Sequence, residues 1–179
     1  MHRFAVLALA LLMMSCGGDS KKEKKEPVSI GSSEKTEKVE TKTTAKGVEF
    51  NEDGTEATVT IEGDDTMKFN LKEIKVKEGM KVTLTLVHTG QMDIEVMGHN
   101  WVLLNQGVDI MDFGGDAASA ADSDYIPSDR LDDIIVHTDL IGGGESTTIT
   151  FDAPAKGEYD FICSFPGHVA LMKGKFIVE

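Results

Sequence analysis

The chain has 179 residues, which is enough for one ordinary domain with extensions, and its formal net charge is −13. This acidity argues against binding to nucleic acid, which needs a basic surface. The charge alone does not identify a protein partner.

Residues 1–15 have the pattern of an export signal. His2 and Arg3 precede a short apolar run, and a small residue stands at the expected cleavage site. The run is too short to cross a membrane as a helix. Because Cys16 follows directly, the segment resembles a bacterial lipoprotein signal, which implies cleavage before Cys16 and lipid attachment to that residue. The alternative is an ordinary signal peptide with an incidental cysteine.

Residues 16–46 contain almost no large apolar side chains and many Lys, Glu, Ser and Thr residues. Such a composition cannot bury enough surface to offset the entropy of the chain, so it predicts a disordered tether. A surface helix is the alternative, and Pro27, Gly31 and several β-branched residues argue against it. A tether of this kind would let a lipid-anchored domain range above the membrane.

A single β domain is expected over residues 47–179, where short runs of Val, Ile, Thr and Phe alternate with Gly and Asp. The alanines between Met111 and Tyr125 predict a short helix inserted between strands. The number and order of the strands favour an all-β, two-sheet sandwich. About eight strands are expected, at 57–62, 67–76, 81–88, 99–105, 134–137, 146–152, 158–163 and 173–178.

Four potential metal ligands stand at strand ends or in one turn. Side chains alternate across a strand, so Cys163 shares a face with the aromatic residues two and four positions earlier. His99 and Met172 likewise share a face with apolar residues of their own strands. His168 lies in the turn between Cys163 and Met172, and this spacing puts three ligands in one short loop. In an antiparallel sandwich such strand ends can meet at one pole.

The types of these ligands favour copper. A thiolate with two imidazoles and a distant thioether suits copper, whereas zinc prefers a closed set of Cys, His or carboxylate ligands. We therefore expect one copper ion, alternating between Cu(I) and Cu(II), bound by His99, Cys163 and His168 with Met172 as a weak axial ligand. Metal ligation would also explain why an exported protein keeps Cys163 unpaired when its other cysteine carries lipid.

Two long motifs carry a resemblance to a known family. They are VMGHNWVL at 96–103 and CSFPGHVALMKG at 163–174. With shorter matches they resemble the azurins, which are cupredoxins, over roughly residues 57–179. The resemblance implies a Greek-key, cupredoxin-like sandwich and a type 1 (blue) copper site in an electron-transfer protein that is not an enzyme.

The resemblance also implies roles for residues around the metal. Gly98 would offer its backbone carbonyl opposite Met172, and Asn100 and the amide of Phe165 would hydrogen-bond near the thiolate. The positions that hold a disulfide in azurins are occupied here by Ala57 and Met80.

An apolar docking surface around His168 is a further implication. At the matching positions stand Met67, Met92, Met97, Phe165 and Pro166. Through such a surface we expect weak contacts with redox proteins, such as c-type cytochromes or copper/haem oxidoreductases. The expected location is the periplasm or cell surface of a bacterium, with the lipid anchor as the only membrane contact.

Two other functions remain open at this point. A copper chaperone or storage module would need exposed, exchangeable ligands, whereas these ligands share faces with core residues. A Cys–His enzyme with Cys163 as nucleophile would need an adjacent base and a substrate cleft.

Overall fold

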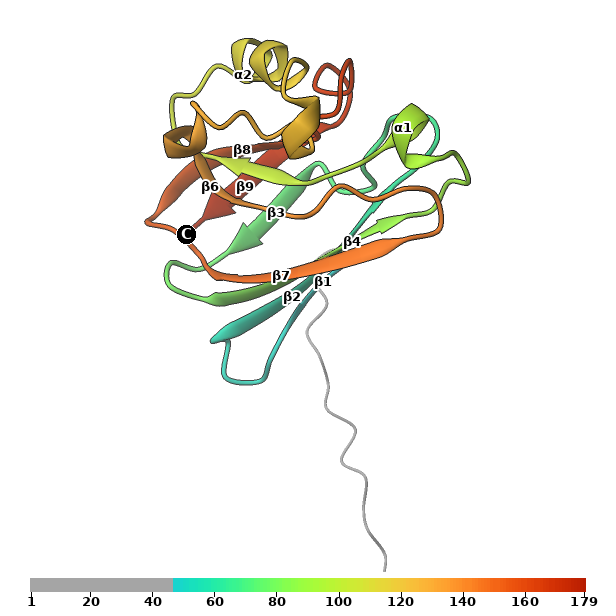
Figure 1. The fold of residues 1–179 in the computed structure, drawn as a ribbon. Coiled ribbons are helices and arrows are strands. Elements are labelled where there is room, and N and C mark those ends of the chain that lie inside the picture. Colours follow the sequence, from blue (N-terminus) through green and yellow to red (C-terminus); the bar gives the residue numbers. More distant parts are fainter. Residues whose placement is uncertain (1–46) are drawn as a thin grey trace, which may run out of the picture. The chain divides into compact units, whose positions relative to one another are not determined.

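Two β-sheets face each other across residues 47–179, which are the residues described by this computed structural model (Figure 1). One sheet has the strand order β1-β2-β4-β7, and the other has the order β3-β9-β8-β5-β6. Successive strands pass repeatedly from one sheet to the other, as the Greek-key expectation requires. The strands are β1 (Val48–Phe50), β2 (Glu56–Gly63), β3 (Glu73–Val76), β4 (Lys81–His88), β5 (Val102–Leu104), β6 (Ile134–His137), β7 (Ser146–Asp152), β8 (Gly157–Ile162) and β9 (Lys173–Val178).

The core between the sheets follows from strict alternation along the strands. In β2, every second side chain from Ala57 is buried, and β4 buries alternate residues in the same way. The two strands pair in parallel, with Ala57 opposite Val82 and Gly63 opposite His88. At the centre the Trp101 ring lies 5.6 Å from Phe161, centroid to centroid. The end of β4 that carries His88 therefore lies beside the end of β2.

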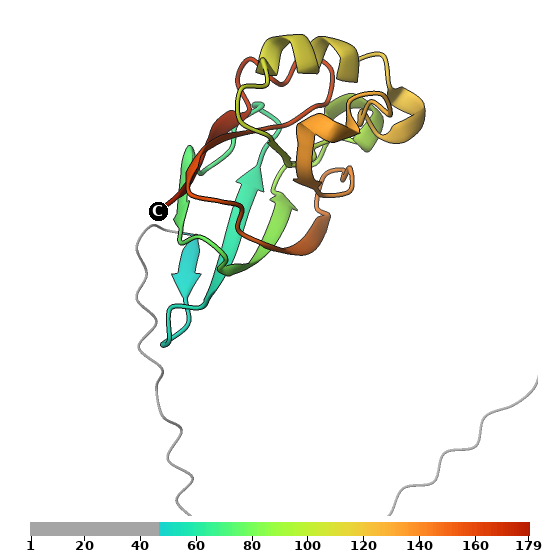
Figure 2. The ribbon, with the colours of Figure 1, turned by 90° about the vertical axis from the view of Figure 1, so that its left-hand side faces the viewer.

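A helical insertion covers the outer face of the second sheet. Helix α2 (Ile110–Ala117) buries Phe113 and Ala117 against a separate apolar cluster that includes Val102 and Ile162 (Figure 2). The Asp109 side chain accepts hydrogen bonds from the first free amides of the helix, which fixes where α2 begins. Shorter helical turns are α1 (Ile94–Met97), η1 (Ala121–Ser123) and η2 (Leu131–Asp133). The predicted inserted helix is confirmed, although it begins before the alanines.

Most of the predicted strands are confirmed, and four of them have the bounds expected from the sequence, namely 81–88, 134–137, 146–152 and 173–178. The prediction of one strand over 67–76 is wrong, because only Glu73–Val76 is a strand. Before it the backbone turns at Met67, whose φ is +56°, and Phe69 makes a single isolated bridge to Gly63. The short strand β1 was not predicted.

Residues 1–46 lie outside the described residues, and with them the predicted signal (1–15), the predicted tether (16–46) and the predicted lipid site at Cys16. Over the described range, none of the helices has the length and apolar character needed to cross a bilayer.

Candidate metal centre

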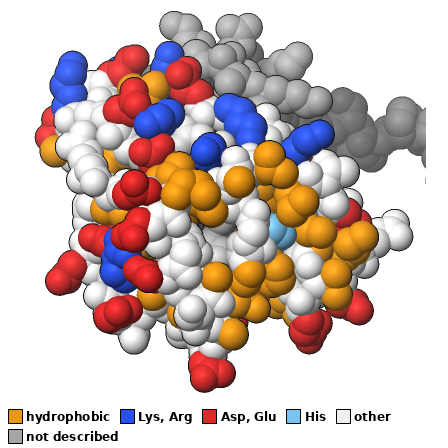
Figure 3. All heavy atoms as spheres, turned by 90° about the horizontal axis from the view of Figure 1, so that it is seen from above, with side chains coloured by type: hydrophobic (Ala, Val, Ile, Leu, Met, Phe, Trp, Pro, Cys, Tyr) orange, Lys and Arg blue, Asp and Glu red, His pale blue; other side chains and the backbone are white. Residues whose placement is uncertain are grey.

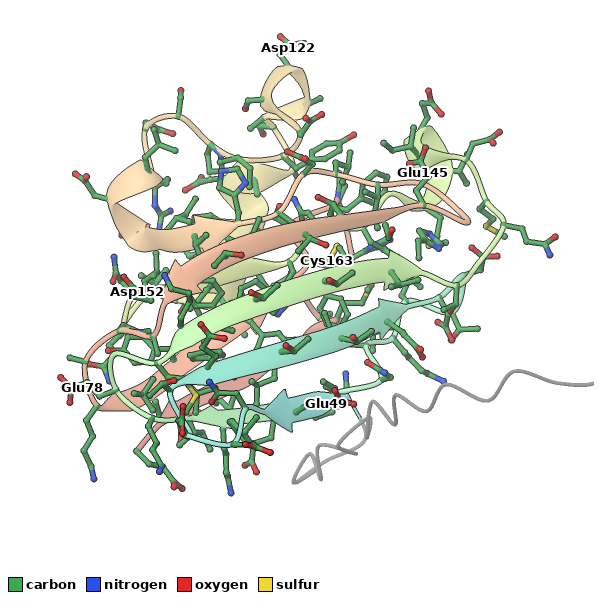
Figure 4. All side chains as sticks on the ribbon, turned by 90° about the horizontal axis from the view of Figure 1, so that it is seen from below. Glu49, Glu78, Asp122, Glu145, Asp152 and Cys163 are labelled. Carbon is green, nitrogen blue, oxygen red and sulfur yellow. The ribbon has the colours of Figure 1, made fainter. Side chains whose placement is uncertain are left out.

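Three buried donor groups converge at one end of the sandwich. One ligand atom each from His99, Cys163 and His168 lies within 4.8 Å of the others. The two histidines and the cysteine are at most 2% exposed. The Cys163 Sγ lies 3.5 Å from Nδ1 of His168. Figure 4 shows Cys163 inside the sandwich, while the acidic side chains labelled with it lie on the outside.

Local backbone hydrogen bonds shape the loop that carries Cys163 and His168. The amide of His168 donates to the carbonyl of Phe165 at 3.0 Å, and Gly167 has φ +82° inside this turn. A proline followed by a glycine is the sequence that such a turn favours. The His168 carbonyl then accepts from the amide of Met172 at 2.8 Å. The loop is therefore held in place by its own backbone before any metal binds.

The ring of His99 is oriented by a backbone carbonyl that the sequence did not indicate. Its Nε2 lies 3.0 Å from the carbonyl oxygen of Asp64, to which an Nε2–H donates. This tautomer leaves a lone pair on Nδ1, which lies 3.0 Å from the carbonyl oxygen of Gly98. Two acceptors at this distance repel each other, and a cation between the donor groups would relieve the repulsion. A histidine fixed through its second nitrogen is typical of metal sites.

Burial keeps the three donor groups neutral in the absence of a cation. It raises the pKa of Cys163 to about 12, although the backbone amides of Asn100 and Phe165 act in the opposite direction. Burial, with the neighbouring rings of His99 and His88, lowers the pKa of His168 to about 4. The pKa of His99 is lowered as well, chiefly by burial. The imidazoles are thus ready to bind a metal, and a bound cation would ionise the thiol.

Met172 and Gly98 lie beside these three groups. Met172 is completely buried, and the Gly98 carbonyl oxygen lies 3.9 Å from Sγ of Cys163. A Cβ at Gly63 would stand 2.7 Å from Cδ2 of His99 and 3.2 Å from Cε of Met172. The side chains of His99 and Met172 therefore both pack against Gly63, and a larger residue there would collide with them. The axial roles of Met172 and Gly98 stay predictions.

Asn100 ties the ligand loop to the segment before β5 that carries His99. Its Oδ1 accepts from the amide of Ser164 at 2.9 Å, and its Nδ2 donates to the Ser164 hydroxyl at 2.8 Å. The amide of Phe165 points at the Cys163 sulfur, as does the backbone amide of Asn100. Ser164 was not singled out in the sequence, because its contact depends on two segments that lie far apart in the chain.

His88 forms a second layer behind the ligands. Its ring stacks on His99 with centroids 4.2 Å apart, and it is almost completely buried. Its Nδ1 accepts from the amide of Gly90, so Nε2–H donates to the carbonyl of Met97.

The predicted docking residues differ in exposure. Met92 is well exposed, Met67, Met97 and Pro166 are half-buried, and Phe165 is only 8% exposed, so it contributes little surface. Val96 and Leu171, which were not predicted, are more than half exposed. Figure 3 shows a histidine among hydrophobic side chains on this face.

The chemistry of these donors fits copper. A buried thiol and two imidazoles, with a thioether beside them, are soft to intermediate ligands. In a comparison with known families, residues 55–179 match the family of copper-binding proteins described as plastocyanin/azurin. The chain belongs to this plastocyanin/azurin family. Its centre at His99, Cys163 and His168 can hold a copper ion.

Relatives of this chain include azurins and a protein named as an outer membrane protein. Azurin-1 of Alcaligenes xylosoxydans xylosoxydans is 46% identical over 124 residues, which cover 66% of this chain and 95% of that protein. The outer membrane protein H.8 of Neisseria meningitidis serogroup B is 47% identical over 120 residues, or 65% of this chain. The match spans only 64% of the length of the H.8 protein.

Solved structures of blue copper proteins have the same fold. Auracyanin A, a blue copper protein of Chloroflexus aurantiacus, superposes with a TM-score of 0.63 at 31% identity. The match covers 69% of this chain and 99% of auracyanin A. The expected cupredoxin-like sandwich is therefore confirmed.

Proposed function

We propose that this protein is a one-electron carrier with a type 1 copper site. The ion would be bound by His99, Cys163 and His168, with Met172 and the carbonyl of Gly98 as weak axial donors. The observation that carries the proposal is the convergence of three buried donors, whose ligand atoms all lie within 4.8 Å of one another. Copper, when bound, supplies the one-electron couple.

The surrounding residues support electron transfer by holding this geometry. A hydrogen bond to the Asp64 carbonyl fixes the His99 imidazole, and backbone hydrogen bonds hold the turn that carries His168. Asn100 fixes the same loop through Ser164. A centre that is held so firmly reorganises little when its charge changes. His168 lies next to the apolar surface, where a redox partner can approach closely.

We also propose a location in the bacterial cell envelope, periplasmic or at the cell surface, with a lipid anchor at Cys16. The basic and apolar start of the chain supports this, and so does the name of the outer membrane protein H.8. The proposed partners are redox proteins such as c-type cytochromes or copper/haem oxidoreductases.

Retention of copper on reduction separates a carrier from a copper chaperone or storage protein. The copper-loaded chain is reduced with ascorbate and mixed with a soluble chelator of Cu(I), and the coloured chelate is followed over time. Because the ligands are buried and held by hydrogen bonds, we expect slow and incomplete transfer of the ion from the reduced chain. Rapid and complete transfer would support a chaperone instead.

A further inference from the structure

Three lysines gather beside the metal centre on a chain whose overall charge is strongly negative. We call Lys68, Lys72 and Lys173 the lysine cluster. The Nζ of Lys72 donates to the carbonyl of Leu171 at 3.0 Å and lies 3.4 Å from the carbonyl of Lys173. Burial lowers the pKa of Lys72, and the charges of Lys173 and Lys68 lower it further, as expected for three ammonium groups close together.

The lysine cluster has no carboxylate partner. Within residues 47–179, Lys75, Lys81, Lys175 and Arg130 form ion pairs, whereas the three cluster lysines, like Lys77 and Lys156, have no carboxylate within 4.0 Å of their ammonium groups. The pKa of Asp64 is lowered chiefly by its hydrogen bond from Thr66, with a smaller contribution from the charge of Lys68. The cluster therefore keeps a net positive charge that faces solvent.

The lysine cluster also borders the proposed docking surface. Lys68 follows Met67 in the chain, and Lys72 holds the backbone of Leu171, whose side chain is 52% exposed. Figure 3 shows a row of Lys and Arg side chains along one edge of the face on which a histidine is visible among hydrophobic side chains, whereas acidic side chains predominate along its other edges. The face is thus apolar at its centre and mainly positive on one side.

We propose that the lysine cluster binds a carboxylate-rich surface next to the redox centre of this protein's electron-transfer partner. The inference rests on the proposed function, because it concerns the partner of the same site. Complementary charge beside an apolar contact speeds the association of two proteins and orients them, and it changes the lifetime of their complex little. Lysines suit this role because their hydrated ammonium groups on long stems make adaptable contacts.

An anionic lipid surface is the competing ligand for three lysines. It would press the metal pole against the membrane and cover the apolar surface through which electrons must pass. A protein partner leaves that path open, so the position of the cluster favours a protein.

A charge-matched pair of triple variants tests the proposal. Lys68, Lys72 and Lys173 are all replaced by Gln in one copper-loaded full chain. In the control, Lys77, Lys81 and Lys156, at the opposite pole, are replaced by Gln, so both variants lose the same charge. Binding of a dye-labelled deca-glutamate peptide is measured by fluorescence anisotropy at low ionic strength, and binding to phosphatidylglycerol vesicles is measured by cosedimentation.

We expect the cluster variant to bind the acidic peptide on the order of tenfold more weakly than the unaltered chain, and the control to bind it almost unchanged. Equal weakening in both variants would overturn the proposal, because net charge alone would then explain it. Loss of vesicle binding without loss of peptide binding would overturn it in favour of a membrane contact. Peptide binding is measured without using the copper couple. If the proposed electron-carrier function failed, the visible spectrum of the copper-loaded chain would show it separately.

Discussion

The thiol of Cys163 and the imidazole of His168 show how strongly burial controls single residues at this site. In the folded chain burial raises the pKa of the Cys163 thiol to about 12 and lowers the pKa of the His168 imidazole to about 4. Both groups are therefore uncharged at neutral pH. A metal ion that binds at neutral pH must therefore displace a proton from sulfur but none from His168.

These pKa shifts predict how the stability of the metal-free domain depends on pH. Unfolded histidines take up protons below about pH 6.5, whereas folding lowers the pKa of His168 to about 4 and also lowers that of His99. Unfolding then takes up protons, so the free energy of unfolding falls as the pH drops from 6.5 towards 4. Above pH 9 the unfolded thiol ionises before the folded one, and stability falls again.

Urea midpoints of the metal-free chain at pH 4.5, 7 and 10 test this expectation, and the midpoint at pH 7 should be the highest. Cys163→Ser should remove the alkaline decline caused by this thiol and leave the acidic one. A midpoint that stays constant across this range would show that these groups are not buried as described.

Met172→Leu tests the axial role of the thioether. We expect the variant to keep copper but to have a higher reduction potential, because a weak donor to oxidised copper is lost. Cyclic voltammetry measures the potential. The matched control is Met80→Leu, which changes a buried methionine outside the metal centre and should leave the potential unchanged. A potential that is equal or lower in Met172→Leu would show that Met172 is not an axial ligand.

At the scale of elements, one arginine links the inserted helix α2 to the η2 turn. The guanidinium of Arg130 donates to Asp133 at 2.6 Å, to Asp112 at 3.1 Å and to Asp116, and it lies 5.5 Å from the ring centroid of Phe113. Hydrogen bonds to these carboxylates raise its pKa further above the ordinary value.

Arg130→Met would leave three carboxylates facing one another without a cation. We expect faster amide hydrogen exchange across Ile110–Ala117, measured by mass spectrometry at low salt. Lys81→Met is the control, because it removes a single exposed ion pair with Asp152 far from α2. Unchanged exchange in the helix of Arg130→Met would show that the network does not hold it.

Strands were predictable where more buried and more exposed side chains alternate along a segment that is paired over its whole length, as in β4 and β7. The segment before β3 misled the interpretation because Phe69 and Leu71 are buried in alternation, as in a strand, although the backbone there turns and makes one bridge. β1 covers only three residues, too few for a periodic signal. The Arg130 network could not be foreseen, because it depends on how α2 and η2 meet in space.

At the scale of the whole molecule, the sandwich brings together donors from distant parts of the chain. The convergence of His99 with the ligand loop was predictable, because strand parity put His99 and Cys163 on inward faces at strand ends and His168 lies in the turn that follows Cys163. The hydrogen bond from His99 to the Asp64 carbonyl could not be predicted, because every residue has a backbone carbonyl and the sequence does not show which one lies near the ring. At the positions that the resemblance to azurins assigns to a disulfide stand Ala57 and Met80, both buried in the core, so apolar packing and the parallel pairing of β2 with β4 join these two segments.

We propose that one pole of this sandwich binds copper through a buried thiolate, and a visible spectrum is the most direct test. The purified chain is titrated with one equivalent of cupric ion, and Cys163→Ser serves as the matched control. We expect an intense visible band from the copper–thiolate bond, absent in the control, together with a reversible one-electron couple. A folded chain that stays colourless, or a Cys163→Ser variant with the full colour, would contradict it.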